Sequence, residues 1–300
     1  MLFRSLLAIT LFAVCCRSQN WTQASGGSTE VWSAVACSDD GTKMVANVFN
    51  GNLWTSTDSG GTWTEDTSIG STKHWTAVAS SADGTKLVAA VMNGNLWTST
   101  DSGSTWTARG TGIAKNWKAV ASSADGTKLV AAVQNGQLWT SINSGSTWTQ
   151  IDMSATISGG NPQNWAAVAS SADGTKLVAV VMNGFVWQST DSGENWYASF
   201  GSTKPWLSVA SSADGTKLVA GVYNGNLWTN HGTWTEDTSV GSTKRWGAVA
   251  SSANGTKLVA AERNGNLWTS TDSGATWTED TSVGSTKPWT LVASSADGST

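Results

Sequence analysis

Apolar positions recur along this chain in short runs, with a period near forty residues. One copy begins at Trp75 and reads WTAVASSADGTKLVAAVMNGNLWTSTDSGSTWTARGTGIAKN, and Trp117 begins the next. A period of this length, with several short strands in each unit, is typical of a propeller blade, which buries its faces only against neighbouring blades. The tryptophans that begin the successive segments are Trp32, Trp75, Trp117, Trp165, Trp206, Trp246 and Trp289.

Turn signals divide each copy into four short strands. In the copy at Trp75, the first strand ends at Asp83-Gly84 and the second at Asn93-Gly94, and both dipeptides tolerate the positive φ of tight hairpins. The second strand, KLVAAVM, is almost continuously apolar, as expected of a strand that is covered on both faces. The third strand, NLWTST, leads through Asp101-Ser102-Gly103 into the fourth, STWTA. We therefore expect an all-β propeller of four-stranded antiparallel blades.

The two ends of the chain bear on the number of blades. Complete copies start near residues 32, 75, 117, 165, 206 and 246, and residues 289–300 supply one more first strand. Residues 20–31 align with a fourth strand and its connector, so the ends contribute to one split, incomplete seventh blade. Either six blades close with loose terminal strands, or a seven-bladed parent has been cut short; we favour the second, because DGST runs naturally into KLVAAV. A single propeller domain is expected over 19–300.

Residues 1–18 have the pattern of a secretory signal peptide. Arg4 precedes an apolar run, SLLAITLFAVCC, that is much shorter than the roughly twenty residues needed to span a bilayer. We expect cleavage near Ser18 and a secreted, extracellular protein without a membrane span. Cys37 is then the one cysteine of the mature chain, which excludes an internal disulfide.

Charge and glycosylation signals add little about the partner. The formal net charge is −4 and the basic residues are spread along the repeats, which argues against nucleic acid as a partner. Asn20 and Asn254 stand in NxT sequons and are possible N-glycosylation sites.

The pattern SxDxGxxW recurs between the third and fourth strands. Good copies run over Ser56–Trp63, Ser99–Trp106, Ser189–Trp196 and Ser270–Trp277. This pattern resembles the Asp-box, or BNR, repeat of sialidases, sortilin-type receptors, xyloglucan-degrading enzymes and photosystem II assembly factors. The resemblance implies a propeller fold over essentially the whole mature chain and says little about function.

The acidic residue of the box is expected to be structural. A short side chain at this turn accepts backbone N–H bonds, glycine takes the positive φ, and the tryptophan closes over the turn. The fifth copy is shortened to TNHGTW, with His231 in the turn. The structural positions are Asp58, Asp101, Asn143, Asp191 and Asp272.

Alternating strand direction places two sets of loops on opposite faces. The connectors between repeats share one face with the Asn-Gly turns, and the Asp-Gly turns share the other with the Asp boxes. The seven tryptophans that open the repeats lie near the first face, where indoles would stack on sugar rings. The alternative is that they wedge between blades.

Two columns on that face differ most between copies. The residue before each Asn-Gly turn includes the ligand-binding candidates Phe49, Gln134, Tyr223 and Arg263, and Met92 and Met182 occupy the same column. The second column precedes each opening tryptophan: Val31, His74, Asn116, Asn164, Pro205, Arg245 and Pro288. A long connector, TISGGNPQ, reaches over the same face. Plain solvent exposure explains the variability equally well.

No constellation supports catalysis. Sialidases use an arginine cluster and a tyrosine nucleophile beside a glutamate, whereas Arg109, Arg245 and Arg263 lie in different repeats. His74 and His231 are far apart, so neither a zinc site nor a nucleophile–histidine pair is supported. Glu262, beside Arg263, is more readily a solvated ion pair than a catalytic group.

We therefore expect no enzyme, no cofactor and no metal. The favoured hypothesis is a secreted propeller that binds carbohydrate or another extracellular ligand, a glycan or a protein, on its Trp-ringed face. The alternatives are a protein–protein interaction scaffold and a degenerate, sialidase-like glycoside hydrolase. The sequence leaves the oligomeric state open.

Overall fold

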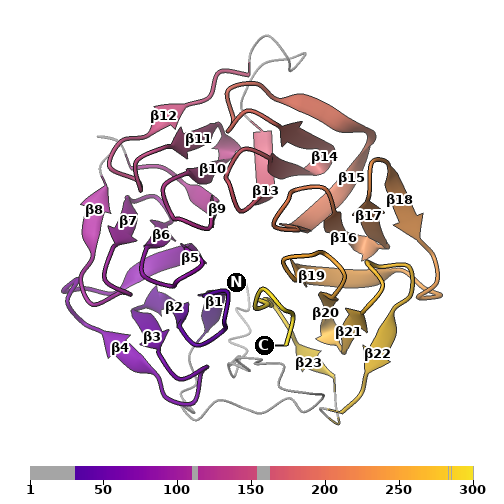
Figure 1. Cartoon of the computed structure of the whole chain (residues 1–300), viewed down its shortest axis with the longest axis horizontal. Coiled ribbons are helices and arrows are strands. Elements are labelled where there is room, and N and C mark those ends of the chain that lie inside the picture. Colours follow the sequence, from indigo (N-terminus) through magenta and orange to yellow (C-terminus); the bar gives the residue numbers. More distant parts are fainter. Residues whose placement is uncertain (1–30, 110–113, 154–162, 283, 285, 300) are drawn as a thin grey trace, which may run out of the picture.

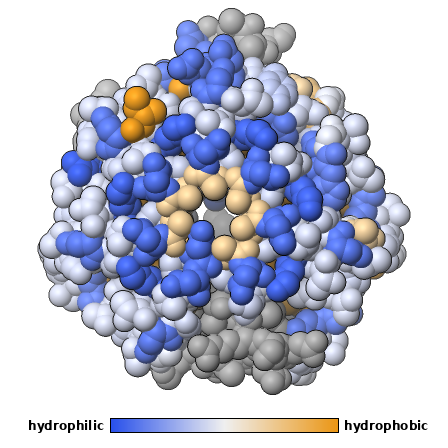
Figure 2. All heavy atoms as spheres, viewed as in Figure 1, coloured by the Kyte–Doolittle hydropathy of each residue, from blue (hydrophilic) through white to orange (hydrophobic). Residues whose placement is uncertain are grey.

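The computed structural model describes residues 31–109, 114–153, 163–282, 284 and 286–299. Within these ranges the chain is all-β, with short antiparallel strands arranged around a central opening (Figure 1). Weakly hydrophobic residues ring that opening on the face shown in Figure 2, and hydrophilic residues surround them. The expected signal peptide and the expected strand over residues 20–30 lie outside the described residues.

The strands follow the order that the turn signals predict. They are β1 (Trp32–Cys37), β2 (Met44–Gly51), β3 (Leu53–Ser56), β4 (Thr64–Asp66), β5 (Lys73–Ser80), β6 (Leu87–Val91), β7 (Leu96–Ser99), β8 (Thr107–Arg109), β9 (Trp117–Ser122), β10 (Leu129–Gly136), β11 (Leu138–Ser141), β12 (Thr149–Gln150), β13 (Gln163–Ser170), β14 (Leu177–Ser189), β15 (Tyr197–Ser211), β16 (Leu218–Gly225), β17 (Leu227–Asn230), β18 (Trp234–Asp237), β19 (Lys244–Ser251), β20 (Leu258–Gly265), β21 (Leu267–Ser270), β22 (Thr278–Asp280) and β23 (Lys287–Pro288).

Successive strands pair as antiparallel meanders. In the repeat at Trp75, β5 pairs with β6, β6 with β7 and β7 with β8. Two strands run through what are separate strands elsewhere: β14 contains the second and third strands of its repeat, and β15 the fourth strand and the first of the next. All five residues of β6 are buried, which confirms that this strand is covered on both faces.

The opening tryptophans join each repeat to the one before it. Trp117 packs against Ala90 and Leu96 of the preceding repeat, and its Nε1 donates a 3.0 Å hydrogen bond to the carbonyl of Gly94 in the preceding Asn-Gly turn. The same bond recurs from Trp75, Trp165, Trp206, Trp246 and Trp289, at 3.0–3.1 Å. A buried indole thus contributes both apolar area and a satisfied donor at each junction.

Backbone hydrogen bonds between the ends of the innermost strands close the arrangement. The amide of Ala82 donates to the carbonyl of Ala124, and the same 2.7 Å bond continues from repeat to repeat. The last of these bonds runs from Ala296 N to Asp39 O, also 2.7 Å, and Cys37 Sγ contacts Ser294 O at 3.3 Å beside it. The segment after β23 therefore lies against β1, and the chain returns to its first described strand.

The Asp-box turns are held by their own side chains, as the sequence predicts. Asp58 accepts hydrogen bonds from Thr62 N and Thr62 Oγ1, both 2.7 Å, and from Ser56 Oγ at 2.8 Å. Trp63 Nε1 closes the turn on the carbonyl of Gly60 at 3.1 Å. These donors, the backbone N–H of Thr62 foremost, lower the pKa of Asp58 to about 2.

The other predicted box residues make the equivalent bonds. Asn143 keeps the backbone bond, with Thr147 N at 2.9 Å, but its Nδ2 donates to Thr147 Oγ1 where a carboxylate would accept. The remaining turns are held at Asp101, Asp191 and Asp272. This supports the structural interpretation of these residues.

The Asp-Gly turns use a related network. Asp83 accepts hydrogen bonds from Ser81 Oγ at 2.6 Å and from the amide of Thr85 at 2.9 Å. Gly84 has φ +67°, and a Cβ there would lie 2.8 Å from Cβ of Lys43 in the preceding repeat. Glycine is therefore required both by the turn and by the close approach of the neighbouring repeat.

Candidate functional site

The two faces carry the loops that strand direction predicts. On one face the Asn-Gly turn after β2 lies beside the next repeat, with Phe49 paired to His74 and Gly51 paired to Lys73. On the other face an Asp-Gly turn contacts the Asp box of its own repeat, through a 2.9 Å bond from Ser102 N to Thr85 O. The variable columns therefore share the first face, as predicted.

The opening tryptophans are not available to a ligand. Trp117, Trp165, Trp206 and Trp246 have no exposed area, and Trp32, Trp75 and Trp289 are at most 6 % exposed. The rings of five of them pack edge-on or tilted against other indoles, as Trp117 does against Trp139 with centroids 6.1 Å apart; the five are Trp32, Trp75, Trp117, Trp206 and Trp246. The hypothesis that these indoles stack on sugar rings is wrong for this structure, because the neighbouring repeat covers the ring faces; they wedge between repeats.

The variable columns meet in one continuous band, which we call the channel-mouth ring. Each residue before an Asn-Gly turn lies between the pre-tryptophan residues of its own repeat and of the next. Gln134 N, for example, donates to Asn116 O at 2.8 Å, while Gln134 pairs with Asn164 across the junction. The same pairing joins Met182 to Pro205, Tyr223 to Arg245, and Arg263 to Pro288.

The chemistry of the channel-mouth ring changes along its length. Phe49 is 38 % exposed and lies against the imidazole of His74, with centroids 5.1 Å apart. Further along, Asn116 Nδ2 donates to Gln134 Oε1 at 3.2 Å. The Arg245 guanidinium lies over the Tyr223 ring, 5.9 Å from its centroid. An apolar sector, an amide sector and a cationic sector therefore follow one another.

The cationic sector contains a small pocket. Its volume is about 190 Å³, and Tyr223, Arg245, Arg263, Asn264, Pro288 and Thr290 line it. Arg245 Nε donates to Asn224 Oδ1 at 3.2 Å, which orients the guanidinium. Arg263 packs over Gly247, where a Cβ would lie 3.0 Å from its Cγ.

Lys118 adds a third positive charge that sequence reasoning missed. It lies on β9, one of the innermost strands, and burial, followed by the charge of Arg263, lowers its pKa. Among the described residues, no ion pair joins Lys118, Arg245 or Arg263 to a carboxylate. The signal was present in the sequence: the equivalent residues of the two preceding copies are Ser33 and Thr76.

Three further expectations from the sequence concern Glu262, the glycosylation signals and a metal site. The carboxylate of Glu262 forms a 3.2 Å ion pair with Lys244. Asn254, a possible glycosylation site, accepts a 2.9 Å bond from the amide of Thr256 and is exposed; Asn20 lies outside the described residues. In the part of the chain that the structure describes, no cluster of three or more His, Cys, Asp and Glu side chains is arranged to hold a metal ion.

No described helix has the length and apolar character needed to cross a membrane.

No family model matches the sequence, and no curated protein matches it. Solved structures do match its fold. YCF48 from Cyanidioschyzon merolae superimposes with a TM-score of 0.67 at 16% identity, over 88% of this chain and 89% of that protein. A structure of YCF48 bound to a D1 peptide matches with a TM-score of 0.63 at 18% identity, over 85% and 83%.

A glycoside hydrolase gives a similar result. An ancestral GH74 enzyme matches with a TM-score of 0.64 at 17% identity, over 83% of this chain but only 38% of the enzyme. All three structures are β-propellers. The chain thus has a β-propeller fold, and at these identities the likeness concerns the fold alone.

Proposed function

We propose that the chain is a secreted, non-catalytic propeller that binds an acidic peptide segment of an extracellular partner at the channel-mouth ring. The observation that carries the proposal is the pocket of the cationic sector, which Arg245 and Arg263 line without a carboxylate partner among the described residues. The charge of Arg263 also acts on Lys118. Positively charged groups left unpaired at an opening attract anionic ligands and speed their association.

The form of the ring favours an extended ligand. Polar and apolar sectors alternate along a curved band, so a peptide laid over it meets a carboxylate-binding sector, an amide sector and Phe49 in turn. A propeller of similar fold, YCF48, is solved with a bound peptide, which supports a protein partner for this fold. Burial of the indoles weakens the carbohydrate hypothesis for this face.

We also propose that the blade count is seven, of which six are complete and one is split. The ring of backbone bonds that ends with Ala296 N to Asp39 O supports this count, because it joins the turns that follow each first strand, from the turn after β1 to the segment after β23. A loose terminal strand would leave that ring open.

The binding proposal is tested with a displayed library of random short peptides. We expect the enriched peptides to carry clustered Asp or Glu, and the double variant Arg245→Gln/Arg263→Gln to weaken them about tenfold or more, equivalent to 1.4 kcal/mol. Arg109→Gln is the matched control: Arg109 lies on β8, where its Nε bonds Thr98 Oγ1 at 2.7 Å. Equal losses in both variants, or enrichment without acidic residues, contradict the proposal.

The proposal that the chain has no catalytic activity is tested separately. We expect no turnover of a panel of fluorogenic glycosides by the purified full chain. Turnover that Glu262→Gln abolishes would overturn it and revive the sialidase-like alternative.

A further inference from the structure

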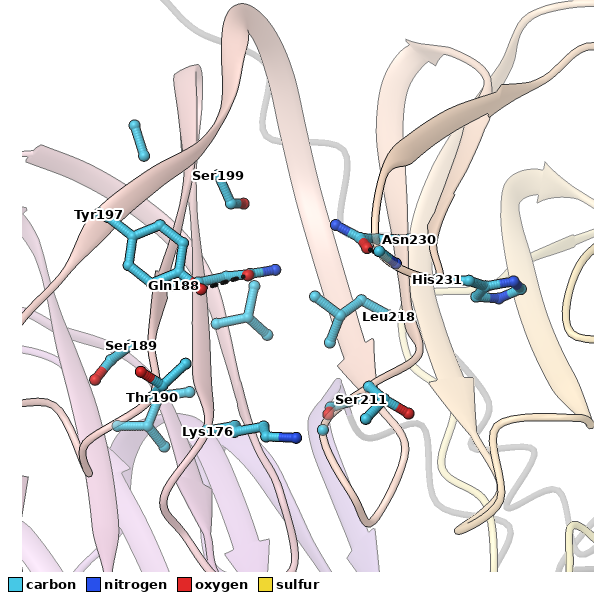
Figure 3. Close-up of a pocket in the computed structure, with 16 residues that line it drawn as sticks. Lys176, Gln188, Ser189, Thr190, Tyr197, Ser199, Ser211, Leu218, Asn230 and His231 are labelled. Carbon is cyan, nitrogen blue, oxygen red and sulfur yellow. Dashed lines mark hydrogen bonds between the residues drawn. The ribbon is translucent and has the colours of Figure 1, made fainter.

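The opposite face contains a larger pocket, which we call the perimeter pocket. Its volume is about 620 Å³, and it lies between β14 with the start of β15 on one side and β16 with β17 on the other (Figure 3). It is separate from the channel-mouth ring and involves none of the residues discussed above for peptide binding. Its walls include Lys176, Gln188, Tyr197, Ser199, Leu218 and Asn230.

The pocket exists because one Asp box is missing. In the fifth copy, the turn between β17 and β18 contains only His231, Gly232 and Thr233, and the amide of Gly232 is held by Asn230 Oδ1 at 2.7 Å. In other repeats the box glycine sits against a threonine of the preceding repeat: a Cβ on Gly103 would lie 2.7 Å from Thr55 Cγ2. The shortened turn leaves that space open.

The two residues that face this opening differ from those at the equivalent positions of the other copies. The third and fourth strands elsewhere place two threonines opposite each other: Thr55 and Thr64, Thr98 and Thr107, Thr140 and Thr149, Thr229 and Thr235, Thr269 and Thr278. Only beside the missing box is the pair Gln188 and Tyr197. Tyr197 Oη and Gln188 Oε1 lie 3.2 Å apart, and Figure 3 shows both side chains turned toward the opening.

The lysine beside the opening has also lost a partner. In three other repeats the lysine after the Asp-Gly turn reaches a serine of the next Asp box, as Lys128 Nζ does at 3.2 Å to Ser192 Oγ. Lys176 Nζ keeps the other contact of these lysines, a 2.8 Å bond to the carbonyl of the next Asp-Gly turn at Asp214, as Lys86 does to Asp125. The shortened fifth turn offers it no box serine. A box deletion and two substitutions thus coincide at one junction.

The lining chemistry suits a neutral sugar. Tyr197 is 47 % exposed and offers a ring face that complements the apolar side of a pyranose. Gln188, Asn230 and Ser199 supply amide and hydroxyl groups, and Ser199 Oγ is fixed by a 3.1 Å bond from Trp234 Nε1. Among the described residues, no carboxylate lines the pocket. Its volume lies within the usual range for small ligands, about 300–1,000 Å³.

We propose that the perimeter pocket binds a neutral mono- or disaccharide, with Tyr197 as the stacking platform and Gln188 as a hydrogen-bonding group. The imidazole of His231 points away from both side chains in Figure 3 and is given no role. This site is independent of the channel-mouth ring, so one proposal can fail without the other.

Saturation-transfer NMR on the full chain tests the proposal, with glucose, galactose, mannose, N-acetylglucosamine and their β-1,4-linked disaccharides as probes. We expect at least one sugar to bind. The double variant Gln188→Thr/Tyr197→Thr restores the pair present in the other copies, so it is expected to fold and to lose affinity about tenfold or more.

A second variant fills the pocket from the other side. Replacing residues 230–233 with STDSGST, the box of the second copy, is also expected to abolish sugar binding. Arg263→Gln is the control and is expected to leave sugar affinity unchanged. The proposal is overturned if no sugar in the panel binds the unmodified protein, or if binding persists in both pocket variants.

Discussion

The amide of Ala296 donates a 2.7 Å hydrogen bond to the carbonyl of Asp39, which joins the last described segment to the first. In the same segment, Trp289 is buried against Ala261 and Leu267. Deleting residues 289–300 removes both the bond and the indole. We expect the unfolding free energy to fall by about 3–5 kcal/mol, which lowers the thermal midpoint by roughly 2–4 °C per kcal/mol. Thermal unfolding followed by circular dichroism measures this, and an unchanged midpoint would show that closure adds no stability.

The burial of the opening tryptophans leads to a second prediction. Trp206 has no exposed area and packs against Trp228 with centroids 6.0 Å apart. Trp206→Ala creates a cavity between two repeats and is expected to cost about 3–5 kcal/mol. Tyr197→Ala removes an exposed aromatic side chain nearby and is expected to change stability by less than about 0.5 kcal/mol. Denaturant titration of both variants tests the contrast, and equal losses would contradict it.

A third prediction concerns acid. Hydrogen bonds from Thr276, and then from Ser270, lower the pKa of Asp272 to about 2, below its ordinary 3.8. Because the folded state has the lower pKa, the stabilisation is complete above pH 4 and is lost as the pH falls through 2. The Asp-Gly turns behave alike at Asp83 and Asp125. We expect the thermal midpoint to be level at neutral pH and to fall between about pH 4 and pH 2.

Substituting one of these residues isolates its share of the acid sensitivity. Asp272→Asn is expected to lower the midpoint at pH 7, and the difference from the parent is expected to shrink as the pH falls towards 2, where about half of the parent's carboxyl groups are protonated. Parallel pH series of the parent and the variant provide the measurement. A constant difference at every pH would assign the loss to packing instead of charge.

The third Asp box offers a substitution that is expected to raise stability. Asn143 already occupies the turn and accepts from Thr147 N at 2.9 Å. In Asn143→Asp, Thr147 N and Oγ1 would both donate to a carboxylate, as Thr105 does to Asp101 at 2.8 and 2.6 Å. Hydrogen bonds to charged acceptors are stronger, so we expect a midpoint higher by about 1–3 °C. Asn143→Ala is the matched control and is expected to lower it.

Internal repetition allowed the fold to be predicted from the sequence. Asp-Gly and Asn-Gly pairs marked the turns, the apolar run at Leu87–Val91 marked a strand covered on both faces, and strand alternation placed the variable columns on one face. Each of these features is local, and each is repeated often enough for the copies to be aligned with one another.

The sites were harder to predict because they depend on contacts between copies. Whether Trp117 faces a ligand or a neighbour is decided by the adjoining repeat, which covers it completely. The pairing of Gln188 with Tyr197 emerges only from the strand register. In the aligned copies, Lys118, Gln188 and Tyr197 all differ from the residues at the equivalent positions. Only the structure relates Lys118 to Arg263 and places Gln188 and Tyr197 beside the shortened fifth turn.

The side-chain hydrogen bonds that the acidic residue of each Asp box accepts come from within four residues of it. One copy can therefore drop its box, as the fifth has done, while the others keep theirs intact. Each repeat is thus a separate place at which shortening the turn between the third and fourth strands opens a cavity at the perimeter. Shortening the box at Asp101 in the same way would be a direct route to an engineered second cavity on the same scaffold.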